Sequence, residues 1–447
     1  MDKNINGQVK CPKCGATDIS QNPNTGKLRC NFCRHEFEQI KSEKMDVNAA
    51  EIEGVHISER AGDIKEDETF VTVKCKGCGA EVVINTNDST HTRCHWCRNI
   101  LSINDKVGSG AVPDVILPFK VKKEEAKENI ENYVKNKKFF AKKEFINQFS
   151  TDNIMGAYFP YMIVDANEHV RLSGIGEVET KRYTYKNGNK TSYKYDADVY
   201  SLSREFDLAV NGLTVESSAD KIQTNSSDKT NNIINAIMPF DTENAVEFNS
   251  SYLRNYTSEK RTLNVEKIKP MVDEQLKDIA RIKAKDSIKK YDRGVRWDTQ
   301  DCDMKGQNWN SAYLPVWLYS YKDTEKLHYI AVNGRTKETV GSIPLDISKL
   351  SIATLIITAI LYIITSIYGD GQSLSLIAGI AFFIFNYLRY TKKTARHTYE
   401  NETKAIMTNL LKTDKKIDSK HKVSNSMITG RNDSDIKGTF INLEKED

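Results

Sequence analysis

The sequence predicts a multidomain α+β protein with two N-terminal zinc ribbons, a β-rich α+β domain, a C-terminal transmembrane helical hairpin and a polar tail. Three observations predict this fold class. Eight of the nine cysteines form four CxxC pairs near the N-terminus, Tyr, Val and Thr alternate with charged residues in the middle, and two uncharged apolar stretches follow residue 350. A length of 447 residues agrees with roughly two to four domains.

The composition is that of a mostly soluble, globular chain. The hydrophobic fraction is 39%, the charged fraction 28% and the formal net charge +4. This charge is too close to zero to imply a nucleic-acid or acidic-lipid partner by itself. Met1 to Gly7 contain no apolar run, so we expect no secretory signal. An odd, clustered set of cysteines without such a signal indicates a reducing compartment and metal binding.

Each cysteine group has the spacing of a zinc ribbon. The first lies within residues 8–38 and the second within 71–104, and corresponding cysteines are offset by 64 positions. The predicted ligands are Cys11, Cys14, Cys30, Cys33, Cys75, Cys78, Cys94 and Cys97. Four thiolates suit a tetrahedral Zn²⁺ and leave no open coordination position, so we predict two structural zinc ions. Redox CxxC pairs are the alternative, but they require a βαβ context that the pattern lacks.

Residues beside the cysteines raise a nucleic-acid alternative. The basic residues there are Lys13, Lys27, Arg29, Arg34, Lys74, Lys76, Arg93 and Arg98. Phe32 and Trp96 stand between paired cysteines, where aromatic rings can stack on bases. We favour the interpretation that these rings cover the zinc sites, because the chain has no strong basic stripe. His35, His91 and His95 are expected at the surface, since four sulfurs already complete each site.

A charged segment, residues 39–70, separates the ribbons and is predicted to be a linker with at most one short helix. The first α+β unit, residues 112–235, follows the second ribbon. We predict a helix over 122–149 and an antiparallel β region over 156–219, because Asn187-Gly188 within alternating residues is a hairpin signal.

A second α+β unit, residues 236–348, resembles the first. Ile116-Leu-Pro-Phe has its counterpart in Ile237-Met-Pro-Phe, and each precedes a helical pattern, the second over 265–291. A strand group is predicted over 313–340, with a tight turn at Val332-Asn-Gly-Arg. Duplication of one helix-plus-sheet unit is therefore one interpretation of the domain.

Two apolar stretches, Ser351 to Tyr368 and Ser373 to Leu388, carry no charge and predict a transmembrane hairpin over 351–390. Buried core helices are the alternative, but both stretches are apolar nearly all round. Positive residues flank the hairpin and the connecting loop has none, so both flanks are predicted to be cytoplasmic. The flanking residues are Lys349, Arg389, Lys392, Lys393 and Arg396. The polar tail, 391–447, is expected to form one helix over 394–411 and then to be disordered.

The sequence contains no catalytic signature that we recognise. It lacks GxxxxGK[ST], GxSxG, HExxH and the protein-kinase motifs. Cys302 has no local partner, and a buried or incidental thiol is the default interpretation. We therefore expect no enzyme and no small-molecule substrate.

Several motifs together resemble a known group of proteins. They are Cys94-His-Trp-Cys97-Arg-Asn, Ala111-Val-Pro-Asp-Val-Ile-Leu-Pro-Phe-Lys, Tyr158-Phe-Pro-Tyr, Met238-Pro-Phe-Asp, Ser251-Tyr-Leu, Tyr313-Leu-Pro-Val-Trp-Leu, Val332-Asn-Gly-Arg-Thr and Gly341-Ser-Ile-Pro. The chain resembles the bacterial membrane proteins with TFIIB-type zinc ribbons over most of residues 75–350. That family usually has Asn-Gly-Gln-Thr-Gly where this chain has Asn-Gly-Arg-Thr-Lys. The resemblance implies, for some members, an association with membrane-stress systems of the phage-shock type and their scaffold proteins.

These patterns predict a zinc-binding, multi-pass protein of the cell membrane with cytoplasmic N- and C-terminal regions. The expected role is an adaptor that recruits partner proteins to the membrane in a stress response. The phage-shock-type scaffold proteins implied by the resemblance are the candidate partners. The alternative is a membrane-tethered nucleic-acid-binding protein that uses its ribbons for recognition.

Overall fold

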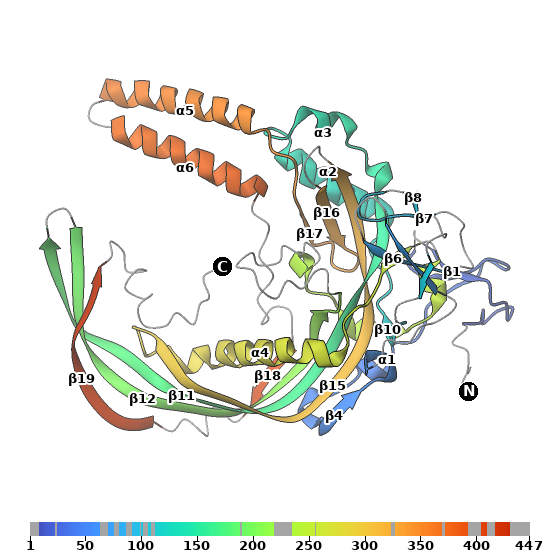
Figure 1. Ribbon diagram of the computed structural model, residues 1–447, viewed down its shortest axis with the longest axis horizontal. Helices are drawn as coiled ribbons and strands as arrows, with labels where there is room; N and C mark the ends of the chain where they lie inside the picture. Colours follow the sequence, from blue (N-terminus) through green and yellow to red (C-terminus); the bar gives the residue numbers. More distant parts are fainter. Residues whose placement is uncertain are drawn as a thin grey trace.

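The structure is a computed structural model in which one large mixed sheet carries the other elements (Figure 1). It describes residues 9–22, 25–62, 70–75, 80–85, 92–98, 100–101, 106–108, 112–187, 190–218, 235–254, 256–322, 327–368, 372–391, 404–408 and 416–429. The cysteine groups lie at one end of the sheet, and a pair of C-terminal helices projects from the body. The mixed α+β class predicted from the sequence is confirmed at this level.

The regular elements are these. The strands are β1 (Ile19–Gln21), β2 (Leu28–Cys30), β3 (Glu36–Phe37), β4 (Gly54–Ile57), β5 (Phe70–Lys74), β6 (Glu81–Asn85), β7 (Thr92–Arg93), β8 (Ile100–Leu101), β9 (Lys106–Gly108), β10 (Val115–Ile116), β11 (Met155–Asn187), β12 (Lys190–Glu216), β13 (Val246–Glu247), β14 (Thr257–Glu259), β15 (Val295–Lys322), β16 (Leu327–Asn333), β17 (Thr339–Gly341), β18 (Lys404–Thr408) and β19 (Lys416–Thr429). The α-helices are α1 (Glu59–Gly62), α2 (Lys123–Lys137), α3 (Lys143–Gln148), α4 (Val265–Ala284), α5 (Ile347–Tyr368) and α6 (Gln372–Thr391).

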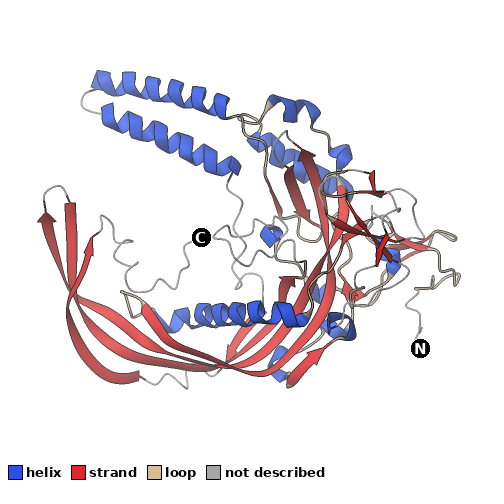
Figure 2. Ribbon diagram, in the orientation of Figure 1, coloured by secondary structure: helices blue, strands red, loops and turns tan. Residues whose placement is uncertain are grey.

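Three very long strands, β11, β12 and β15, lie side by side in the large sheet and curve together (Figure 2). β11 and β12 are the predicted hairpin, in which Asn187 pairs with Lys190 across the expected turn. β15 pairs antiparallel with β11 from Met155↔Leu318 to Gly176↔Val295. The part of the hairpin beyond the last pair with β15, residues 177–187 and 190–199, is called the β11–β12 ribbon.

Helix α4 packs on the concave face of the long strands and closes the core there (Figure 1). Asn264 caps it, because its side chain accepts a hydrogen bond from Lys267 N at 3.3 Å. Ile268, Leu276 and Ile279 lie on one face of the helix and are fully buried against the sheet. Burial of each such side chain stabilises the fold by about 1.5–3 kcal/mol.

The two predicted α+β units contribute interleaved strands to the same sheet. β10 from the first unit pairs parallel with β15 from the second through Val115↔Ala312. β14 from the second unit pairs parallel with β11 through Ala157↔Thr257. Each unit therefore completes the other, and the two are not separated in space.

The segment predicted as a linker packs on the sheet instead. Two 3₁₀ turns (Glu43–Met45 and Ala49–Glu51), β4 and α1 occupy it, and β4 pairs parallel with β15 through Gln307↔Val55. Asn167 Nδ2 fixes the segment by donating to Ala50 O at 3.0 Å and Ile52 O at 3.2 Å. These partners are distant in sequence, so local composition does not indicate them.

The tail prediction is wrong in the part that the structure describes. Residues 404–408, expected to be helical, form β18, which pairs with β12 through Ala209↔Ile406. Residues 416–429, expected to be disordered, form β19, which pairs with β12 through Lys194↔Met427. β12 would otherwise present unpaired backbone groups along this edge, and the tail satisfies them.

The predicted hairpin forms two packed helices, α5 and α6. In the described residues, one helix is long and apolar enough to cross a membrane, over Ile347–Ile367 with a mean hydropathy of 2.3. The apolar part of α6, Leu374–Tyr390, is shorter. By this criterion of length and hydropathy, the prediction of two spans is supported for α5 and not for α6.

Candidate metal centres

The first cysteine group converges as its spacing predicts. Cys11, Cys14, Cys30 and Cys33 bring their sulfur atoms within 4.8 Å of one another. The Cys11–Cys33 and Cys14–Cys30 Sγ distances are 3.5 and 3.6 Å. A tetrahedral zinc ion with bonds of about 2.3 Å places its sulfur ligands about 3.8 Å apart. The group therefore fits one closed, four-thiolate zinc site.

Tight backbone turns place these sulfurs. Cys11 O accepts a hydrogen bond from Gly15 N at 2.9 Å, and Gly15 has a φ of 75°, as expected for the glycine after a CxxC pair. Arg34 N donates in the same way to Cys30 O, with a φ of 63°. Here an arginine adopts the left-handed conformation, at a cost of about 1–2 kcal/mol. A metal bound by the adjacent cysteines would offset that cost.

The local electrostatics favour thiolate formation at Cys11. Desolvation acts against its ionisation, but hydrogen bonds from the backbone N–H groups of Cys14 and Lys13, together with those of the neighbouring thiols, lower the pKa of the Cys11 thiol to about 7. The Cys14 thiol shifts the other way: a backbone hydrogen bond at Ala16 lowers its pKa, but desolvation and the other three thiols raise it to about 12. Because the thiolate is the form that binds zinc, the N–H groups at Cys11 assist metal binding.

The second cysteine group repeats the first. Cys75, Cys94 and Cys97 lie within 4.8 Å of one another, and Cys78 lies outside the described residues. Cys75 N donates to Ala80 O at 2.8 Å, as Cys11 N does to Ala16 O. Arg98 has a φ of 63° and donates its N–H to Cys94 O at 2.8 Å. Two cysteine clusters that can hold metal ions are thus present.

The second ribbon is docked on the large sheet through the residues between its last two cysteines. Trp96 Nε1 donates to Glu259 Oε2 at 3.0 Å, and the indole ring packs against Phe159 and Tyr329 with centroids 5.6 and 4.9 Å away. His95 Nδ1 shares a hydrogen bond of 3.1 Å with Thr257 Oγ1. The expected surface position of His95 is wrong, since it is only 1% exposed.

Strand pairing extends this docking. β6, within the second ribbon, pairs antiparallel with β14 through Ser258↔Val83 and Glu259↔Val82. Glu259 therefore lies in the strand that joins ribbon and sheet, and its other oxygen accepts a hydrogen bond from Ser218 Oγ at 3.2 Å. Sequence reasoning missed Glu259, because no local pattern links it to residues more than 160 positions earlier.

The first ribbon is docked through its hairpin rather than through its last cysteine pair. Gln21 Nε2 donates to Phe119 O at 3.4 Å, and its Oε1 accepts from Tyr158 OH at 3.1 Å. A Cβ at Gly26 would clash with Phe119 O, so glycine is needed for this close approach. Phe32, at the position that corresponds to Trp96, stays 81% exposed.

Comparison with known proteins finds a distant relative of the chain. It is 25% identical over 346 residues to the uncharacterized protein YdjG of Bacillus subtilis (strain 168), which covers 76% of this chain and 91% of that protein. The two chains are distant homologues. No protein-family model and no solved structure matches the chain.

The residues considered for nucleic-acid binding differ in their exposure between the two ribbons. At the second ribbon, Trp96 is buried and Arg98 packs over the Tyr319 ring, 5.0 Å from its centroid. At the first ribbon, Lys13, Phe32 and Arg34 are all exposed. Lys27 pairs with Glu38 at 3.2 Å, Arg29 and His35 are half-buried, and Arg93 is exposed. Lys76 and His91, and the side chain of Lys74, lie outside the described residues.

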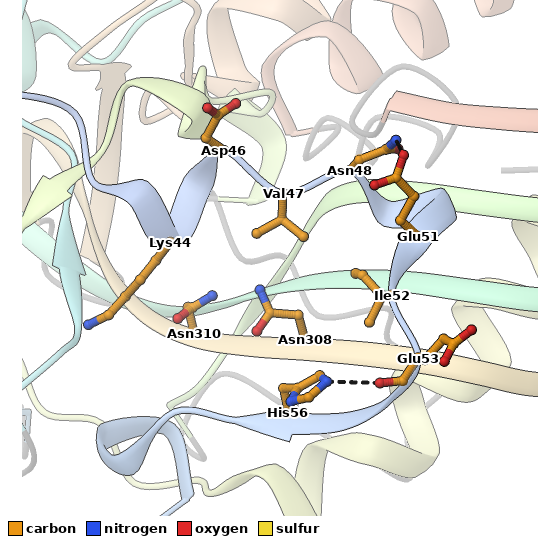
Figure 3. A pocket seen from close by; sticks show the side chains of 10 residues that line it. All are labelled: Lys44, Asp46, Val47, Asn48, Glu51, Ile52, Glu53, His56, Asn308 and Asn310. Atoms are coloured by element: carbon orange, nitrogen blue, oxygen red, sulfur yellow. Dashed lines mark hydrogen bonds between the residues drawn. The ribbon is translucent and has the colours of Figure 1, made fainter.

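Two further features lie outside the ribbons. Cys302 is half-buried, and burial raises the pKa of its thiol to about 12, which agrees with an unreactive cysteine. A pocket of about 460 Å³ opens where the segment after the first ribbon crosses β15 (Figure 3). Asn308 and Asn310 lie along β15 beneath it, and His56 Nε2 lies 2.8 Å from Glu53 O at its rim. No sequence signal indicated this pocket.

Proposed function

We propose that this protein is a membrane-anchored zinc adaptor rather than an enzyme. In this proposal, α5 and α6 cross the bilayer, and the ribbons and the sheet face the cytoplasm. Partner proteins bind this cytoplasmic part and are thereby held at the membrane. The resemblance to the TFIIB-type ribbon proteins suggests phage-shock-type scaffold proteins as candidates.

The observation that carries the proposal is the exposed apolar surface of the two C-terminal helices. Only 6% of the most apolar part of α5 is buried by the rest of the chain. The large exposed apolar side chains include Ile352, Leu355, Ile356, Ile360, Ile363 and Ile367 on α5, and Leu374, Ile377, Ile380, Ile384 and Phe385 on α6. A continuous apolar surface of this kind is unstable in water and typical of membrane contact.

The packing between the helices suits a lipid environment. A Cβ at Gly379 of α6 would clash with Thr358 of α5, so a small residue permits close approach there. Thr354 and Thr358 donate their hydroxyls to helix carbonyls, each at 2.8 Å, and Asn386 Nδ2 donates to Phe382 O at 2.9 Å. These polar groups are therefore satisfied inside the helices, as a bilayer core requires.

The arrangement in Figure 1 imposes a condition on membrane insertion. The α5–α6 hairpin and the distal end of the β11–β12 ribbon extend toward the same side of the molecule. A bilayer around the hairpin would then also meet the β11–β12 ribbon, in which Lys181 and Arg182 are exposed. Insertion therefore requires a change in the relative positions of the hairpin and the distal β11–β12 ribbon.

Membrane extraction tests the anchoring. The full chain should stay in the membrane pellet after alkaline carbonate treatment, and a variant without residues 347–391 should be released. Full release of the intact chain would contradict the proposal.

Co-purification tests the adaptor role. After cross-linking in cells, the full chain should recover specific proteins from membranes, and Cys75→Ser with Cys78→Ser should lose them. Cys302→Ser, which changes a cysteine outside both clusters, is the control and should retain them. Recovery of no protein above the background of untagged cells would count against the adaptor role.

Nucleic-acid binding is the second candidate, favoured by the exposure of Phe32, Lys13 and Arg34 on the same ribbon. It predicts salt-sensitive binding of single-stranded DNA or RNA by the full chain. Phe32→Ala should weaken this binding more than Arg98→Ala, because Arg98 already packs on Tyr319. Absence of binding at low salt would remove this candidate.

A further inference from the structure

We propose that residues 135–143, which we call the basic loop, form a second membrane contact that binds anionic lipid headgroups beside the α5–α6 hairpin. The basic loop joins the end of α2 to the start of α3. This inference rests on the proposed membrane anchoring, and it adds the class of lipid that the cytoplasmic part recognises.

The basic loop carries several exposed lysines and presents an aromatic side chain. Its five lysines are Lys135, Lys137, Lys138, Lys142 and Lys143. Lys135, Lys138 and Lys143 are exposed, and no acidic side chain in the described part of the chain pairs with them. Phe139 is 77% exposed, although phenylalanine favours burial. Unpaired lysines around an exposed aromatic ring are typical of contact with an anionic bilayer surface.

Direct contacts fix the basic loop at the base of the hairpin. Tyr390 OH, at the end of α6, donates to Lys137 O and accepts from Phe140 N at 3.2 Å. Arg389 Nη2 donates to Asn136 O at 2.9 Å. Lys349 Nζ, near the start of α5, donates to Ala141 O at 3.3 Å. The loop thus touches both helices where they meet the body of the protein.

This position places the basic loop at the level of the bilayer surface. Lys349 and Arg389 are the charged residues that bound the apolar helices, and such residues lie among lipid headgroups. The contacts of the loop with these residues and with Tyr390 hold it against the base of the hairpin. The loop therefore lies at headgroup level, and Phe139 can enter the interface beside it.

The neighbourhood of Lys137 also favours an anion. Its ammonium donates a hydrogen bond to Tyr133 OH and lies 4.1 Å from the centroid of the Tyr133 ring. Burial and the nearby Arg389 lower the pKa of Lys137 to about 8. A phosphate group between Lys137 and Arg389 would relieve this repulsion and restore the charged form.

The experiment uses a fluorescent reporter at the exposed position. The full-length Phe139→Trp protein is reconstituted in vesicles of phosphatidylcholine, alone or mixed with phosphatidylglycerol, with and without acyl-chain bromination. Bromine quenches only nearby indoles, and the four native tryptophans are at most 8% exposed. We expect quenching of the introduced tryptophan that increases with phosphatidylglycerol and decreases with salt.

Charge variants separate specific contact from simple proximity. In the same background, Lys135→Gln, Lys138→Gln and Lys143→Gln together should abolish the dependence of quenching on phosphatidylglycerol. The matched control is Lys285→Gln, Lys289→Gln and Lys290→Gln, which removes three exposed lysines after α4 and should leave that dependence unchanged. Equal quenching in both lipid mixtures, or equal effects of the two triple variants, would overturn the inference.

Carbonate extraction of the same vesicles separates this inference from the proposed function. Protein that is extracted has not inserted, and both proposals then fail. Protein that resists extraction while its introduced tryptophan is not quenched leaves the anchoring intact and overturns only the lipid contact.

Discussion

At the residue scale, the aromatic residue between the last two cysteines is buried in the second ribbon and exposed in the first. Trp96 is 4% exposed and bonded to Glu259, whereas its counterpart Phe32 is 81% exposed. The sequence shows an aromatic residue at both positions, and it cannot show which one meets a partner inside the chain. An indole N–H beside a buried carboxylate is a specific interaction, and phenylalanine cannot make it.

We predict that Trp96→Phe destabilises the protein and that Phe32→Ala does not. Trp96→Phe removes the indole donor to the buried carboxylate of Glu259, at a cost of about 1–3 kcal/mol. The thermal midpoint in detergent should fall for this variant, and Phe32→Ala should change stability by less than about 0.5 kcal/mol. Equal midpoints for Trp96→Phe and the wild type would show that the Glu259 contact contributes nothing.

Glu168 predicts a pH dependence of stability. It lies on β11 and is 2% exposed, and burial raises its pKa to about 7, with a further contribution from Asp273 that Lys269 and Lys277 oppose. The folded state therefore binds more protons than the unfolded chain between pH 4.5 and about 7. Stability falls as the pH rises through this window, and the whole penalty is present above it.

Glu168→Gln removes this penalty. At about pH 8 the variant should be more stable than the wild type by about 1–3 kcal/mol, and at about pH 4 the difference should nearly vanish. Thermal melts at the two pH values measure this, with the exposed Glu128→Gln as the control. A stabilisation that is the same at both pH values would contradict the role of ionisation.

At the element scale, local patterns were predictable and long-range pairing was not. The Asn187 turn, the apolar period of α4 and the cysteine spacing are each contained in a short stretch of sequence, and the structure has all three. β4 and β19 pair with strands far away in the chain. Their register depends on the edge that the partner strand offers, which no local window contains.

The cysteine clusters predict two zinc ions per chain, and substitution of a ligand in one cluster should remove one of them. Zinc analysis of the purified protein should find two ions per chain, and Cys30→Ser should retain about one, because three thiolates bind zinc much less tightly than four. Cys302→Ser is the matched control and should retain both ions, since Cys302 lies on β15 outside either cluster. An unchanged metal content in Cys30→Ser would contradict the four-cysteine site.

At the scale of the whole molecule, the sheet joins parts that the sequence analysis treated as separate. Both ribbons are docked on it, the segment between them adds a strand, and the tail extends the β11–β12 ribbon. The hairpin is the exception, since its contact with the body lies at its base in the described part of the chain, around Phe140, Leu350 and Tyr390.

The number of spans can be decided by labelling single cysteines from outside intact cells. The three positions are Lys138, at the base of the hairpin, Asp370, between the helices, and Ser424, on β19, each changed to Cys in the Cys302→Ser background. With two spans and a cytoplasmic body, a membrane-impermeant maleimide should label only the cysteine at position 370, because the positive flanks hold both ends inside. Labelling of positions 370 and 424 would mean that only α5 crosses. Labelling of none before permeabilisation would mean that neither helix does.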